Sequence, residues 1–286
     1  MVDQPPCEKV ELFLLGGFEL RAGTRRVELP FRVQRLAAFL ALANRRLHRS
    51  YVSGQLWLDV TQDQAYGSLR AAVWEARRLA NPLVEATSRH VALSPIVIVD
   101  AHELSACADR LLDEHAVRWD DVGYLSGAGN ELLPDWYEDW VVEERDQLRE
   151  RRALALEAAA ERLIREQRYA QASSAALATI RADPLRESAY ELLIGSYLAT
   201  GNASGARRQF ELLATRLRSI GLRPTNRLEN LVRELGCTSP RTRSHSSGPP
   251  GTARQPLQNA ITSQSVGSEM RPSPLVRFTM ADIQRM

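Results

Sequence analysis

The segment SLRAAVWEARRL, residues 68–79, decides the fold of the first part of this chain. Its apolar residues recur with helical spacing: Leu69, Ala72, Val73, Ala76 and Ala80. This i, i+3, i+4, i+7 pattern predicts an amphipathic helix with one face against a core. The opposite face carries Gly67, Ala71, Trp74 and Arg78, with Arg70 and Arg77 beside it. We therefore expect the exposed side of this helix to be cationic, with a tryptophan in its middle.

The neighbouring segments place this helix in a winged helix-turn-helix. Alternating apolar residues and turn glycines predict strands, and apolar residues at helical spacing predict helices. The expected elements, in chain order, are a small antiparallel sheet over residues 10–29, a helix over 31–43 ended by Asn44, a short helix capped by Ser50, a helix over 64–80 and a hairpin over 83–99. The hairpin would supply the wing.

From residue 101 onward the pattern is helical and repeats with a period of 34 residues, which is typical of tetratricopeptide repeats. The matched pairs at this offset are Leu163 with Tyr197, Arg168 with Asn202, Tyr169 with Ala203 and Ala172 with Ala206. Two repeats cannot cover their own faces, so helices over 103–118 and 137–156 are expected to complete the stack. Trp136, Tyr137 and Trp140 are expected to pack between helices, with a ligand groove as the alternative. The predicted fold class is mainly α with small β elements.

The chain of 286 residues divides by composition and charge. We predict a flexible N-terminus over 1–8, a DNA-binding domain over 9–100, a helical domain over 101–236 and a disordered tail over 237–286 rich in Ser, Pro, Thr, Arg and Gly. Residues 9–100 hold 13 basic and 8 acidic side chains, a net charge of +5, whereas residues 101–236 hold 18 and 23, a net charge of −5. This asymmetry favours a polyanion as the partner of the first domain alone.

Several function classes are excluded by what the chain lacks. Lys9 is the only lysine, so no phosphate-binding Walker A loop is present. The five histidines form no HExxH motif, no GxSxG accompanies them, and the three cysteines include no CxxC pair. We therefore expect no enzyme, no cofactor and no metal. The longest apolar run, LAAFLALA at 36–43, is far shorter than the ~20 residues of a membrane helix, so we expect a cytoplasmic protein with no membrane partner.

Several longer motifs carry a resemblance to a known family. They are LW and Asp at 56, 57 and 59, the helix segment at 68–79, ELLPDWYEDWVVEER at 131–145, RYAQA at 168–172 and DPLRESAYELLIGSYLATGN at 183–202. The chain resembles, over residues 10–235, the bacterial activators that join a winged helix of the OmpR/PhoB kind to a bacterial transcriptional activation domain, as in SARP-type activators. Relatives usually carry a basic residue and a leucine where this chain has Glu75 and Ala76.

The resemblance implies that residues 68–79 enter the DNA major groove and that the hairpin supplies a wing near the backbone. The candidate DNA-binding residues are Ser68, Arg70, Ala71, Trp74, Arg77, Arg78, Arg89, His48 and Arg49. Arg89 at the hairpin tip could reach a phosphate or the minor groove, and His48 and Arg49 could meet a phosphate at a helix N-terminus. For Trp74 the alternative is packing on the hairpin; for the arginines it is a solvated face, and for His48 and Arg49 an ordinary loop.

The sequence therefore predicts a regulator that recognises promoter DNA and activates a biosynthetic or pathway gene cluster. The helical domain would contact RNA polymerase or pair two protomers in a homodimer. Two alternatives stay open. One is an adaptor whose helical repeats bind a partner protein, with the winged helix as an interaction module. The other is a repressor with the same fold.

Overall fold

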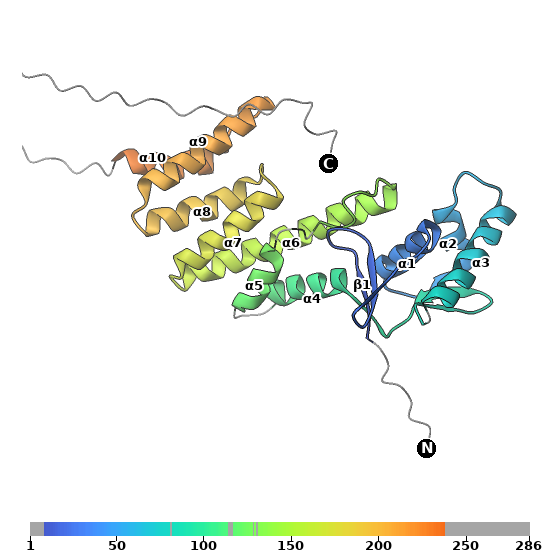
Figure 1. The fold of residues 1–286 in the computed structure, drawn as a ribbon. Helices are drawn as coiled ribbons and strands as arrows, with labels where there is room; N and C mark the ends of the chain where they lie inside the picture. The colour runs from blue at the N-terminus through green and yellow to red at the C-terminus, as the bar shows by residue number, and fades with distance from the viewer. Residues whose placement is uncertain (1–8, 81, 114–116, 128, 130, 238–286) are drawn as a thin grey trace, which may run out of the picture. The chain divides into compact units, whose positions relative to one another are not determined.

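The computed structural model describes residues 9–80, 82–113, 117–127, 129 and 131–237, all of them in one compact unit (Figure 1). The predictions for residues 1–8 and for 238–286 of the tail lie outside the described residues. The fold is mainly α with small β elements, a winged helix-turn-helix followed by tetratricopeptide-like helices, as the sequence predicts. The sequence-based domain limits, 9–100 and 101–236, stay predictions.

The chain begins with a four-stranded sheet. Its strands are β1 (Val10–Phe13), β2 (Glu19–Ala22), β3 (Arg25–Val27) and β7 (Val97–Val99), in the order β3-β2-β1-β7. β7 pairs in parallel with β1, so the expected hairpin over 83–99 is wrong at its far end. The break lies at Ser94, whose backbone N–H donates to the carbonyl of Leu83 at 2.9 Å, followed by Pro95, which has no N–H for a ladder. The second strand of the hairpin therefore stops before Pro95 and the chain returns to the first sheet.

Three helices and a small second sheet form the rest of the winged helix. The helices are α1 (Phe31–Ala43), α2 (Arg49–Leu56) and α3 (Gln62–Leu79), and the sheet joins β4 (Leu47–His48), β6 (His90–Leu93) and β5 (Val84–Ala86) in that order. α1 ends as expected at Asn44, whose φ of 46° is the left-handed conformation that asparagine tolerates. α3 begins two residues before the predicted start, after Thr61, whose N–H donates to the side chain of Gln64 at 3.2 Å.

The expected cap of the second helix at Ser50 is wrong. His48 occupies the N-cap position of α2 and makes no side-chain capping bond, while its ring contacts the Ser50 hydroxyl at 2.6 Å. The start of the helix is set by strand pairing. His48 lies opposite His90 in the β4–β6 ladder, and the N–H of Arg49 donates to the carbonyl of Arg89 at 2.9 Å. A contact 40 residues away in the chain therefore fixes this boundary.

The second half is a stack of helices in chain order. They are α4 (Asp100–Asp113), α5 (Trp119–Ser126), α6 (Asp139–Arg165), α7 (Tyr169–Ala182), α8 (Glu187–Ala199), α9 (Ala203–Ser219) and α10 (Asn226–Cys237). Figure 1 shows α6, α7, α8 and α9 lying side by side. The predicted repeat is visible at the two turns, where Gln167 and Gly201 adopt positive φ values of 61° and 74°. The matched alanines, Ala172 and Ala206, are fully buried and let the paired helices approach closely.

The core of the winged helix is completed from the second half of the chain. Leu132, Leu133 and Val141 are buried in the same cluster as the winged-helix core. Trp140 meets the ring of Phe39 on α1 edge to face at 5.2 Å, and Trp136 stands against Phe31 at 5.2 Å. The expected packing of Trp136 and Trp140 is confirmed. For Tyr137 it is wrong, because this side chain is 83% exposed.

The packing of Trp140 against Phe39 gives a stability prediction. Trp140→Ala removes a large ring from the edge of the winged-helix core, and we expect a loss of about 2–4 kcal/mol in the free energy of unfolding. Tyr137→Ala, three residues away, removes an exposed ring and should change stability by less than about 0.5 kcal/mol. Urea unfolding followed by tryptophan fluorescence and circular dichroism checks both values. Equal losses in the two variants would contradict the packing described.

Candidate nucleic-acid interface

α3 presents the face that the sequence predicts. Leu69, Ala72, Val73 and Ala76 are buried, whereas Arg70, Trp74, Arg77 and Arg78 are exposed. Ser68 and Ala71 are half-buried between these two groups, and Ala80, expected in the core stripe, is half-buried just past the helix. The 18-residue helix therefore separates a packed apolar side from a solvent side that carries three arginines.

Trp74 pairs with an arginine side chain at the surface instead of packing on the hairpin. Its side chain is 63% exposed, and the guanidinium of Arg78 lies over the indole ring at 5.2 Å from the centroid. The two residues are four positions apart, so one turn of helix brings them together. Such a cation–π pair holds the long arginine side chain against the helix and restricts its rotamers.

Arg77 connects the helix to the wing. Its Nη2 donates to the backbone carbonyl of Ala86 on β5 at 2.8 Å. The same side chain borders a recess of about 390 Å³ that is also lined by Arg46, His90 and Glu85. Arg46 was not among the predicted residues, although the pair of arginines at 45 and 46 ahead of β4 is a visible basic signal. Arg77 therefore both fixes the hairpin on α3 and adds charge beside it.

The structure brings the remaining candidates together at the turn of the hairpin. Arg49 donates from Nη1 to the carbonyl of Thr87 at 3.2 Å, and Thr87 closes the turn by accepting from the N–H of His90 at 3.0 Å. The rings of His48 and His90 meet edge to face at 5.3 Å. Arg89 stands exposed on this turn. Residues predicted from two separate stretches of sequence, 48–49 and 89, thus lie together beside α3.

An acidic residue on α3 is neutralised from another helix, which no sequence spacing revealed. Arg32 on α1 donates from Nε to Oε2 of Glu75 at 2.6 Å, and its Nη2 bonds the other carboxylate oxygen. The hydrogen bond from Arg32 lowers the pKa of Glu75, so this carboxylate is ionised at neutral pH. Position 75 therefore holds a paired carboxylate, 43 residues from its partner in the chain.

The described residues offer no metal centre. No group of three or more His, Cys, Asp or Glu residues there is arranged to hold a metal ion. Cys107 is a buried free thiol beside Asp121. Every helix in that part of the chain is too short or too polar to cross a bilayer.

The architecture defines a class of protein, a winged helix followed by tetratricopeptide-like helices. Comparison with known proteins adds a domain family and a similar solved structure. Residues 101–235 match the family model of the bacterial transcriptional activator domain. The chain is similar in fold to the solved structure of Mycobacterium tuberculosis EmbR in complex with a low affinity phosphopeptide, with 21% sequence identity and a TM-score of 0.62. The similarity covers 82% of this chain and 66% of the EmbR chain.

A search of curated proteins gave no match. The family match is thus confined to residues 101–235, and the likeness to EmbR concerns the fold.

The Glu75 pair gives a test of the interface. Glu75→Gln removes a negative charge from α3 and releases Arg32, so binding to duplex DNA should become several-fold tighter at low salt. Fluorescence anisotropy with a labelled duplex measures the change. Glu19→Gln is the matched control, since Glu19 pairs with Arg21 in the first sheet, away from α3. Unchanged or weaker binding by the Glu75 variant would place DNA elsewhere.

Proposed function

We propose that this protein is a sequence-specific DNA-binding regulator that activates transcription of a biosynthetic or pathway gene cluster. The observation that carries the proposal is the exposed face of α3, where Arg70, Trp74 and Arg78 stand opposite a buried apolar stripe. An α-helix fits the major groove of B-DNA, and arginine is the side chain that most often reads guanine there. The hairpin beside α3 is assigned to the DNA backbone.

The roles of the candidate residues follow from their contacts. Among the described residues neither Arg70 nor Arg78 forms an ion pair within 4.0 Å, although the charge of Arg78 helps to lower the pKa of Glu75, and both arginines are assigned to base or phosphate contacts. Ser68 and Ala71 have small side chains, which allow α3 to approach the groove closely. Arg77 and Arg49 are assigned chiefly to positioning, because each donates to a carbonyl of the hairpin. Arg89 and His48 are assigned to the phosphate backbone at the wing.

The helical domain is proposed to bind protein, with RNA polymerase or a second protomer as the partner. Its net charge of −5 over residues 101–236 opposes binding to phosphates. Stacked helix pairs of this kind offer extended surfaces for other proteins. A homodimer would set two recognition helices on adjacent half-sites and raise the effective concentration of the second.

The recognition helix is tested by charge removal. Arg70→Ala and Arg78→Ala should each weaken binding to a cognate promoter by about 1–3 kcal/mol, the usual worth of a bidentate base contact, with little change in melting temperature. Arg26→Ala, on β3 of the first sheet, removes the same charge and should leave affinity nearly unchanged. Val73→Asp places a charge in the core and should unfold the domain.

A salt titration of the wild-type protein separates the regulator from the adaptor alternative. Neutralising phosphates releases counterions, so log K falls linearly with log salt for a true duplex binder. An adaptor would bind duplex weakly at every salt concentration. If Arg70→Ala and Arg78→Ala both bound the promoter with wild-type affinity, α3 would not be the recognition helix.

Activation is tested in a reconstituted system with purified polymerase and a bound promoter. We expect transcript yield to rise in proportion to promoter occupancy by the full-length protein, with occupancy measured by footprinting in the same reactions. The Arg70→Ala variant should activate at the wild-type level once its concentration restores occupancy, because the polymerase contact lies in the helical domain. A fall in transcript with rising occupancy would identify a repressor.

A further inference from the structure

A basic pocket lies in the otherwise acidic helical domain. It is a hollow of about 410 Å³ between α6, the last turn of α7 and the loop after α5. Arg145, Arg149 and Arg152 project into it from α6, and Arg181 projects from α7. Glu131 is the only acidic residue among those that line it. The volume is within the range of small-molecule sites in proteins.

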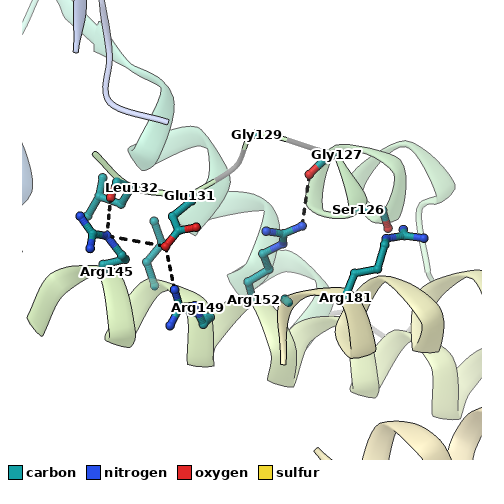
Figure 2. Close-up of a pocket in the computed structure, with 11 residues that line it drawn as sticks. Ser126, Gly127, Gly129, Glu131, Leu132, Arg145, Arg149, Arg152 and Arg181 are labelled. Atoms are coloured by element: carbon teal, nitrogen blue, oxygen red, sulfur yellow. Dashed lines mark hydrogen bonds and ion pairs between the residues drawn. The ribbon is translucent and has the colours of Figure 1, made fainter. Parts of the chain in front are cut away.

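The charges in this pocket are unevenly compensated, as Figure 2 shows. At one end Glu131 pairs with Arg149 at 2.8 Å and lies 3.9 Å from Arg145. The other contacts of Arg145 hold the fold together, since it donates to the backbone carbonyls of Leu132, Leu133 and Trp136. The Glu131 carboxylate therefore balances positive charge at the end of the pocket that faces the winged helix.

At the other end two arginines share a site without a carboxylate. The half-buried Arg152 donates to the backbone carbonyls of Leu125 and Gly127, the latter at 3.3 Å. Arg181 points toward the same loop, at Ser126. Neither guanidinium has an ion pair with a carboxylate among the described residues. Burial, and then the charge of Arg181, lower the pKa of Arg152, so the charged guanidinium carries an electrostatic cost that no carboxylate partner among the described residues offsets.

A ligand with an oxyanion group would remove that cost. Guanidinium groups bind phosphate and carboxylate through paired N–H donors, and two of them at one site can hold both faces of such a group. The pocket is concave and walled by a loop, which suits a small molecule better than a helical polyanion. We propose that Arg152 and Arg181 bind a small anionic ligand through its phosphate or carboxylate group.

The wall of this pocket also belongs to the contact with the winged helix. The carbonyl of Glu131 accepts from the N–H of Gly16 at 2.7 Å, and Leu133 donates to the carbonyl of Leu14 at 2.8 Å. Leu132 forms an isolated antiparallel bridge with Leu15. A ligand in the pocket would therefore contact the loop that holds the two halves of the chain together, and we expect it to raise the melting temperature of the whole unit.

The test is calorimetric titration of the full chain with pyrophosphate, inorganic phosphate and citrate at constant ionic strength. We expect saturable binding at one site, and the order of affinities will show whether phosphate or carboxylate is preferred. Arg181→Gln should weaken that binding at least tenfold without changing the melting temperature of the free protein. Arg207→Gln, an exposed arginine on α9, makes the same charge change outside the pocket and should alter affinity less than twofold.

Arg152→Gln should also abolish binding, but it breaks contacts to two carbonyls, so Arg181 carries the test. Equal weakening by the Arg181 and Arg207 variants would show general charge attraction and overturn the proposal. Failure of all three anions to bind would do the same. Displacement of pyrophosphate by a short duplex would assign the two arginines to the DNA backbone and would also overturn it.

Discussion

The structure depends on how the open side of the winged-helix core is closed. The side chain of Arg145, only 11% exposed, donates to three backbone carbonyls of the segment 132–136 and so holds that segment in place. The segment then delivers Leu132 and Leu133 into the core and sets Trp136 beside Phe31. A buried guanidinium bound to backbone carbonyls is a strong, directional restraint, because each bond is charge-assisted. Without it, apolar surface on α1 would face water.

This closure explains why the two halves behave as one unit. Asp100, at the start of α4, accepts hydrogen bonds from the N–H groups of Leu14 and Leu15 at 2.8 and 3.0 Å. β7 enters the first sheet immediately before it. The connection is therefore made by backbone pairing, a half-buried carboxylate and an aromatic cluster, not by a free linker. A shift of α6 would therefore displace α1, which packs directly against α3.

The proposed interface uses the rigidity that this packing provides. α3 is held by its apolar stripe, by the Arg32–Glu75 pair and by the bond from Arg77 to the wing. Its solvent side is thereby free to carry residues that serve no packing role, such as Arg70 and the Trp74–Arg78 pair. Opposite charges also divide along the chain, with +5 over 9–100 and −5 over 101–236, a division that supports the proposal of a DNA partner for the first half and a protein partner for the second.

The sequence by itself determined the elements and the face of α3, because helical periodicity and turn residues act over a few positions of the chain. The buried stripe at Leu69, Ala72 and Val73 and the repeat at Ala172 and Ala206 were read in this way. Only the tertiary structure decided the start of α2, the transfer of β7 to the first sheet and the neutralisation of Glu75 by Arg32. Each of these depends on a partner 40 or more residues away, and neither local propensity nor spacing encodes which distant group will arrive.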